Sequence, residues 1–150
     1  EAVMAGYQRL VEIVETIFED YTEFRYRPEA VEKTEFIPLK LGYLPEEMEE
    51  VERDETPISL DIVYKDKKEQ FFEVDQKIIE ERDKTTYIVD MGSIPADLDS
   101  ARRENIRFVY PEKYNEKRVW VIWLYEGYRV VIQSNLPEEE IVKIINHIEF

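Results

Sequence analysis

The sequence predicts an α+β fold: a twisted, mainly antiparallel sheet of about six strands with an amphipathic helix near each end of the chain. Three observations support this prediction. Apolar residues recur at helical spacing near both termini, they alternate with polar residues after residue 57, and residues 119–125 are apolar throughout. The length of 150 residues suits a single domain, in which residues 1–42 form a helix and an extended lead-in and residues 43–150 form the sheet core and the final helix.

Residues 5–20 are predicted to form the first helix. Their apolar side chains recur at i, i+3, i+4 and i+7, while glutamates take the other face. The apolar positions are Tyr7, Leu10, Val11, Val14, Ile17, Phe18 and Tyr21. Such a stripe is typical of a helix that packs on a core, and a partner-binding face is the alternative. The acidic polar face argues against a helix that lies on a membrane.

Residues 22–45 are predicted to be extended, because Pro28, Pro38 and Pro45 interrupt any helix there. Residues 32–37 are a candidate edge strand. An acidic run follows, made of Glu46, Glu47, Glu49, Glu50 and Glu52. This run lacks the spaced Asp or Asn ligands and the central Gly of a calcium-binding loop, so we expect a solvated acidic face.

Residues 57–91 are predicted to form an antiparallel meander with one face towards the core. Ile58, Leu60, Ile62 and Tyr64 alternate with polar residues, which is typical of a half-buried strand. Polar turns then separate a returning strand over residues 72–78 from a third strand over residues 85–91.

Residues 92–104 are predicted to be a loop with one helical turn near residues 97–103, followed by a short strand over residues 106–110. The loop region carries a local basic group, Arg102, Arg103 and Arg107, in an otherwise acidic chain. We expect these arginines to pair with nearby carboxylates, and an anion site is the alternative.

The clearest strand signal is the run over residues 119–125, which is expected to be a central strand covered on both faces. Glu126 and Gly127 form a two-residue gap before residues 128–132, which predicts a hairpin. Trp120 and Trp123 should point to opposite faces, so at most one of them is expected to be fully internal.

A second helix is expected to close the chain. Asn135 and Glu138 fit a capping box around Pro137, and the acidic residues 138–140 suit the positive end of a helix dipole. The expected buried stripe consists of Ile141, Ile144, Ile145 and Ile148.

Composition excludes several functions. The formal charge of −15 argues against a simple nucleic-acid binder, because a phosphate backbone would be repelled. The absence of Cys excludes thiolate catalysis, disulfides and zinc–thiolate sites. His147 is the single histidine, so a histidine-based zinc site within one chain is excluded, and we expect this residue to lie at the C-terminal end of the last helix.

We therefore predict no catalytic, cofactor-binding or metal-ligating residue and no cofactor. No glycine-rich loop is present to hold a phosphate, because the four glycines lie far apart. A pair of carboxylates beside a tryptophan platform, as in a carbohydrate-active protein, stays open as an alternative, since 35 acidic residues give many pairs.

Three segments resemble a known bacterial family. Residues 123–132 read Trp-Leu-Tyr-Glu-Gly-Tyr-Arg-Val-Val-Ile, and residues 136–144 read Leu-Pro-Glu-Glu-Glu-Ile-Val-Lys-Ile. Residues 42–48, Gly-Tyr-Leu-Pro-Glu-Glu-Met, resemble the Tyr-Leu-Pro motif that opens the same domain. The family is a domain of unknown function found at the C-terminus of membrane-anchored, anti-sigma-factor-like proteins of Gram-positive bacteria. The resemblance covers about residues 43–148 and extends more weakly to the preceding helix and lead-in.

The resemblance implies an extracytoplasmic domain on a single-span protein whose upstream part binds a sigma factor, and it carries over no catalytic residue. The chain opens with Glu1, which fits both an anchoring segment upstream and an arbitrary start. We therefore expect a non-enzymatic sensory or protein-interaction domain, attached to the cell membrane through a segment absent from this chain. Its protein partner or cell-envelope ligand is not identified, and no nucleic acid is expected. The alternatives are an acidic binding adaptor in the cytoplasm and a small carbohydrate-binding or carbohydrate-active protein.

Overall fold

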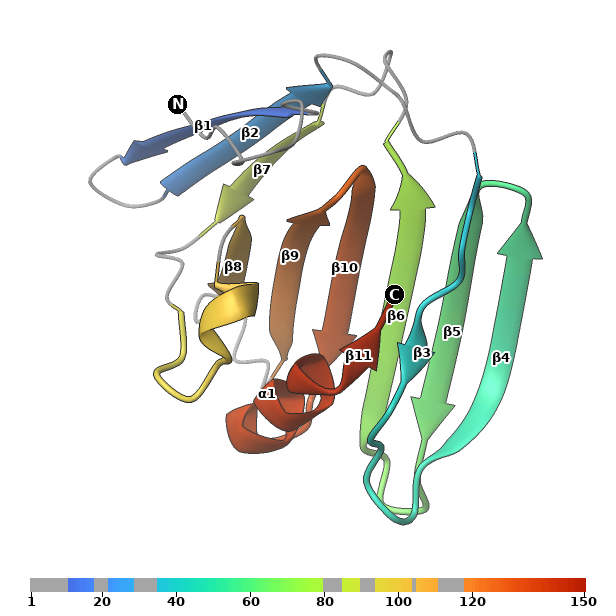
Figure 1. Ribbon diagram of the computed structural model, residues 1–150. Coiled ribbons are helices and arrows are strands. Elements are labelled where there is room, and N and C mark those ends of the chain that lie inside the picture. Colours follow the sequence, from blue (N-terminus) through green and yellow to red (C-terminus); the bar gives the residue numbers. More distant parts are fainter. Residues whose placement is uncertain are drawn as a thin grey trace.

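The computed structural model places a six-stranded antiparallel sheet at the centre of the molecule (Figure 1). In their order across the sheet, its strands are β4 (Glu49–Thr56), β5 (Ser59–Lys65), β6 (Phe71–Ile78), β10 (Tyr128–Ser134), β9 (Val119–Tyr125) and β8 (Ile106–Val109). Each neighbouring pair runs antiparallel. The predicted mainly antiparallel sheet of about six strands is therefore confirmed.

Smaller elements accompany this sheet. The helix α1 (Glu138–Asn146) is followed by β11 (Ile148–Glu149), which pairs with β3 (Lys40–Leu41). A separate antiparallel sheet has the order β1 (Val11–Ile17), β2 (Thr22–Pro28) and β7 (Thr85–Val89). A 3₁₀ turn spans Ser100–Arg102, within the region where the sequence predicts a helical turn.

The structure describes the backbone of residues 11–17, 22–28, 35–79, 85–89, 94–103, 105–110 and 118–150, and the side chains of these residues outside β1, β2 and β7. In this part of the chain no helix has the length and apolar character needed to cross a membrane.

One face of the six-stranded sheet, which we call the helix face, packs against α1 (Figure 1). Alternate residues of each central strand supply this core, as the period of two in a strand requires. The sheet contributes Leu60, Ile62, Phe72, Val74, Ile106, Phe108, Val121, Trp123, Val130 and Ile132. Ile141, Ile144 and Ile145 of α1 are each 0% exposed, which confirms three members of the predicted stripe. The fourth, Ile148, is also 0% exposed but lies in β11 and not in the helix.

The lead-in before β4 also covers the helix face. Its Ile37 N–H donates to the Tyr128 hydroxyl at 2.9 Å, and the Phe36 ring meets the Tyr128 ring edge-on with centroids 5.7 Å apart. The β3 strand then pairs with β11 on the same side of the sheet as α1 (Figure 1). Sequence-distant segments therefore close one apolar layer over the sheet.

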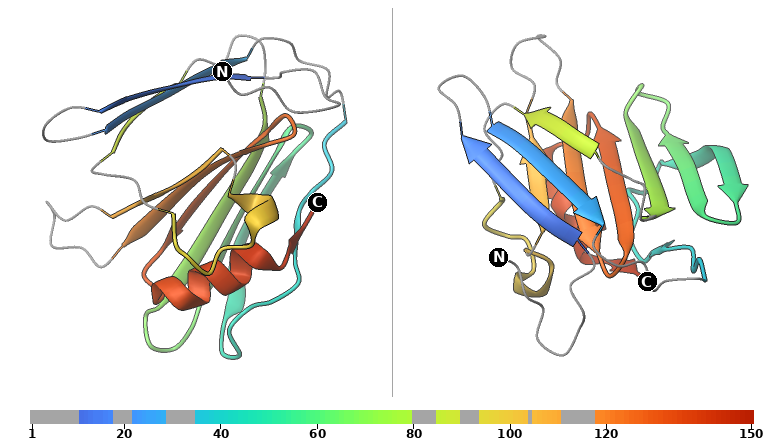
Figure 2. Two further views of the ribbon diagram at one scale, coloured as in Figure 1. Left: turned by 60° about the vertical axis from the view of Figure 1, so that its left-hand side comes forward. Right: turned by 90° about the horizontal axis from the view of Figure 1, so that it is seen from above.

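The opposite face, which we call the outer face, changes character along its width. Over β8 and β9 it carries the buried side chains of Val109, Ile122 and Leu124. Figure 2 shows the three-stranded sheet on this side, over β8, β9 and β10. Over β4, β5 and β6 the outer face is polar apart from Val63 and Phe71, and Asp61 and Asp75 are directly paired there. The candidate site described below lies on the polar part of the outer face.

The predicted N-terminal helix over residues 5–20 is wrong where the structure describes it. Val11–Ile17 is the strand β1, paired with β2. Five of these seven residues are valine, isoleucine or threonine, whose branched side chains fit a strand better than a helix. The rest of the predicted helix lies outside the described residues.

Three smaller expectations also need correction. The predicted meander ends after β6, because β7 joins β2 in another sheet. Residues 35–37 of the predicted edge strand are irregular, and residues 32–34 lie outside the described part. The capping box is wrong because the Asn135 side chain binds the Phe71 N–H and the Glu69 carbonyl, so Pro137 is the N-cap without a side-chain bond.

The hairpin of β9 and β10 is confirmed, with Glu126 and Gly127 at positive φ in its two-residue turn. β9 lies inside the sheet between β10 and β8 and is buried on both faces, as its continuous apolar run predicts.

Candidate functional site

His147 closes α1, at the end of the helix where the sequence predicts it. Its backbone N–H donates to the Ile144 carbonyl at 3.1 Å, and its Nδ1 lies 2.7 Å from the Lys143 carbonyl oxygen. The imidazole ring of His147 therefore contacts a backbone carbonyl in the last turn of the helix. Across the described ranges, no group of three or more His, Cys, Asp or Glu side chains is arranged to hold a metal ion.

The basic group of Arg102, Arg103 and Arg107 binds backbone carbonyls. Arg102 Nη2 donates to the Ile148 carbonyl at 2.9 Å, and Arg103 Nη1 donates to the Pro95 carbonyl at 2.8 Å. For Arg102 and Arg103, backbone carbonyls take the place of the predicted carboxylate partners, which satisfies covered backbone acceptors. Arg107 Nη1 likewise donates to the Ile106 carbonyl at 2.8 Å. These contacts give no support to an anion site.

The edge strand β4 is the most distinctive exposed element. It ends the six-stranded sheet (Figure 1), and all eight of its residues are exposed. Its sequence, Glu-Glu-Val-Glu-Arg-Asp-Glu-Thr, carries five carboxylates and one guanidinium, a formal charge of −4. The predicted solvated acidic run is confirmed, since it leads into this strand and all its members are exposed.

The two faces of β4 are not equivalent. Arg53 binds Glu50 and Glu55 on the helix face, with Nη–Oε1 distances of 2.7 Å and 2.6 Å. Glu52 and Asp54 belong to the outer face, opposite Val63 and Asp61 in the register. The register shifts between Glu50 and Glu52, so Val51 is the extra residue of a β-bulge.

Three more carboxylates adjoin Asp54 on the outer face. Asp61 of β5 pairs with Asp54 on one side and with Asp75 of β6 on the other, and Glu73 lies two residues from Asp75. We call Glu52, Asp54, Asp61, Glu73 and Asp75 the acidic surface. The five residues occupy three adjacent strands, where directly opposite residues lie about 5 Å apart.

The electrostatics of the acidic surface favour a cationic partner. Burial, together with the negative charges of Asp61, Asp75 and Glu52, raises the pKa of Glu73 above its usual value. Burial also raises the pKa of Asp75, although the Arg129 guanidinium, 4.0 Å from that carboxylate, opposes the rise. These carboxylates therefore repel one another, and a nearby positive charge would relieve the repulsion.

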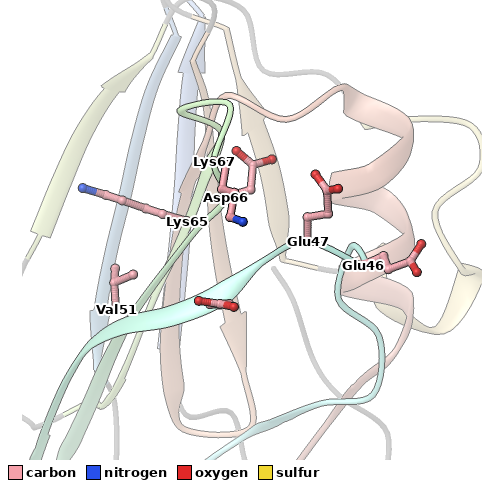
Figure 3. Close-up of a pocket in the computed structure, with 7 residues that line it drawn as sticks. Glu46, Glu47, Val51, Lys65, Asp66 and Lys67 are labelled. Carbon is pink, nitrogen blue, oxygen red and sulfur yellow. The ribbon is translucent and has the colours of Figure 1, made fainter.

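A cavity of about 580 Å³ adjoins the first residues of β4 (Figure 3). One side is formed by the turn before β4 and by the strand itself, with Glu46, Glu47, Glu49 and Val51. The other side is formed by Lys65, Asp66 and Lys67 at the turn between β5 and β6. The lining is charged apart from one valine, which suits a side chain of a bound segment better than an apolar small molecule.

The two tryptophans lie on opposite faces of β9, as predicted. Trp123 is 1% exposed and packs against the Phe150 ring with centroids 5.3 Å apart, so it offers no platform for a sugar. Trp120 is half-buried on the outer face, opposite Gln133.

Sequence reasoning did not single out the acidic surface. Asp61, Glu73 and Asp75 occupy polar positions in alternating strands, where charged side chains are ordinary. In the sequence, Asp61 lies two residues from Ser59, and Glu73 lies two residues from Asp75, so each pair lies on one face of its strand. This alternation indicates an acidic surface only once the register that pairs Asp61 with Asp75 is known.

Comparison with known proteins places this architecture in a family. Residues 38–148 match the model of a domain of unknown function, DUF4367. The match includes all six strands of the central sheet and α1. A search of curated proteins gave no match. The expected resemblance to a domain of unknown function is therefore confirmed at the level of the domain, and this chain belongs to the DUF4367 family.

Proposed function

We propose that this chain is a non-enzymatic protein-interaction domain, held outside the cytoplasm by a single membrane span upstream of Glu1. The observation that carries the interaction role is the β4 edge, an end strand whose eight residues are all exposed and whose charge is almost entirely negative. The acidic surface continues this charge onto β5 and β6. Together they form a surface suited to steering and holding a basic partner.

The proposed location is supported by the resemblance of residues 42–48, 123–132 and 136–144 to a domain of membrane-anchored, anti-sigma-factor-like proteins. In such a protein, an event at the outer domain would be passed through the span to a cytoplasmic segment that binds a sigma factor. The chain itself would supply the binding surface and no chemistry. The carboxylates of β4 face solvent, so a substrate bound there would stay hydrated. Because catalytic sites work by excluding water, these carboxylates suit binding and not catalysis.

Protease treatment of intact cells tests the location. The full-length gene product should carry a tag after Phe150, and cells with permeable walls should be treated with a protease that cannot cross the membrane. We expect the tag to be lost from intact cells and the protein to sediment with membranes. A tag that survives until the cells are lysed contradicts the proposed location and favours the cytoplasmic adaptor.

The cytoplasmic adaptor uses the same acidic surface, so it differs in location and not in binding chemistry. Both roles predict partner binding that weakens with salt, because exposed charges are screened beyond about 8 Å at physiological ionic strength. The protease experiment therefore separates two roles that a binding measurement would not distinguish.

A further inference from the structure

We infer that β4 receives a basic, extended segment of a partner protein as an added strand of the sheet. This inference rests on the proposed protein-interaction function and names the chemistry of the partner. The segment pairs with the backbone of β4, while its lysine or arginine side chains meet the carboxylates of that strand.

The geometry of the edge permits strand addition. β5 pairs with one side of β4, and within the described residues no strand pairs with the other side. An end strand presents a row of backbone N–H and C=O groups that another extended chain can bind. The bulge at Val51 interrupts the regular ladder, so residues 52–56 form the part of the edge best suited to pairing.

The negative charge of the β4 edge determines which kind of segment can bind there. Arg53 engages Glu50 and Glu55 on the helix face. On the outer face, Glu52 and Asp54 have no ion-pair partner among the residues that the structure describes. A directly opposite residue of an added strand would lie about 5 Å away, within reach of a lysine or arginine head group. Asp61 lies immediately behind Asp54 and adds to the attraction.

The same charge disfavours a second copy of this chain as the occupant. Two β4 edges would bring ten carboxylates together with two guanidinium groups, twice the content of one strand. Like charges opposite one another destabilise a strand pair. The edge is therefore protected from self-association while it stays open to a basic segment.

The bulge end of the edge adds an apolar contact. Val51 is 55% exposed and lines the cavity beside the start of β4 (Figure 3). An apolar side chain of the bound segment can cover Val51 there, next to the charged walls formed by Glu46 and Lys67. The expected ligand is thus a stretch of alternating basic and apolar residues.

Amide hydrogen exchange with defined peptides tests strand addition. The probe is a short peptide with blocked ends in which lysine and valine alternate, and a matched peptide is methylated at every backbone nitrogen. Both carry the same charge, but the methylated peptide has no N–H to donate. At low salt we expect the first peptide to slow exchange of alternate β4 amides about tenfold or more, and the methylated peptide to leave them unchanged.

A pair of charge-matched variants tests the role of the outer face. The double change Glu52→Lys and Asp54→Lys should weaken binding of the lysine–valine peptide about tenfold or more. The control, Asp97→Lys with Glu139→Lys, makes the same change in net charge at two exposed residues, one in α1 and one in the loop that Asn146 of α1 binds, and should bind nearly as well as the natural chain.

Equal protection of β4 by both peptides, or no protection by either, overturns strand addition. If the lysine–valine peptide perturbs only the acidic surface and leaves β4 exchange unchanged, strand addition is wrong while the interaction function stands. If the protease experiment places the domain in the cytoplasm, the proposed location fails and the peptide result is unaffected.

Discussion

The side chain of Gln76 binds the backbone at Leu39, across the helix face of the sheet. Its Oε1 accepts the Leu39 N–H at 2.7 Å, and its Nε2 donates to the Ile37 carbonyl at 3.0 Å. Gln76 is 0% exposed and lies between Val74 and Ile78 on the apolar side of β6. One buried amide therefore satisfies two backbone groups of the lead-in, which has no strand partner at this point.

Replacing this amide should loosen the lead-in. Gln76→Met keeps the volume and leaves the Leu39 N–H without its acceptor, so we expect a loss of about 1–3 kcal/mol in the free energy of unfolding. Urea denaturation measures the loss. Gln133→Met, on the outer face of β10, is the control and should cost less than about 0.5 kcal/mol. Equal losses in the two variants would show that the Gln76 hydrogen bonds are unimportant.

Glu73→Gln should stabilise the domain at neutral pH. The folded state raises the pKa of Glu73 above its ordinary 4.5, so the native state binds more protons than the unfolded state in the pH range between these two pKa values. The free energy of unfolding therefore falls as pH rises through the native pKa. Removing the charge should raise Tm at pH 7 by about 1–3 °C.

The same variant should lose its advantage in acid, because Glu73 is protonated in both states well below its ordinary pKa of 4.5. Thermal unfolding at several pH values gives the comparison, with the exposed Glu35→Gln as the charge-matched control. The mutual repulsion of the acidic surface is refuted if Glu73→Gln gains no more than the control at pH 7, or keeps its gain in acid.

Ile144→Ala should remove a central contact between α1 and the sheet. The side chain is 0% exposed, and deletion of a buried isoleucine typically costs about 2–5 kcal/mol. Glu139→Ala on the exposed side of the same helix should cost less than about 1 kcal/mol, chiefly through the helix dipole. Denaturant titration of both variants provides the measurement. A small loss for Ile144→Ala would mean that α1 does not form part of the core.

Gly42→Ala should disturb the junction between the lead-in and the end of α1. A Cβ at this position would lie 2.7 Å from the His147 carbonyl oxygen, the same atom that accepts the Gly42 N–H at 2.9 Å. The backbone must shift, at a cost of about 1–3 kcal/mol. Exchange of the amide at position 42, which donates to the His147 carbonyl, should accelerate, whereas the exposed neighbour Lys40→Ala should leave it unchanged. Unaltered exchange in Gly42→Ala would place the two segments further apart than the structure does.

Local sequence patterns correctly predict those elements for which the order of apolar and turn-forming residues fits only one type of secondary structure. The run over residues 119–125, the Glu126–Gly127 turn and the isoleucine stripe of α1 each lead to the observed element. The failure at residues 11–17 has a physical cause. Val11, Val14 and Ile17 fit a helical period, but the many branched side chains of this segment also suit a strand, and pairing with β2 decides between them.

The candidate site depends on strand pairing, which cannot be read from a single sequence. Asp61 and Asp75 are 14 positions apart in the chain, and their contact follows from the register of β5 with β6. The position of β4 at the edge depends in turn on which strands β5, β6 and β10 select as neighbours. The acidic run itself is visible in the sequence, whereas its role as an unpaired edge is a property of the sheet.

Crosslinking in living cells tests the role of the β4 edge most directly. A photo-reactive amino acid should replace Asp54 in the full-length protein, and a second variant should carry it in place of Glu139, which is also exposed and lies on α1. We expect a partner protein to be captured from Asp54 and not from Glu139, with a basic extended segment at the crosslinked site. Capture of the same partner with equal yield from Glu139, or through a folded acidic surface of that partner, would contradict the proposed binding edge.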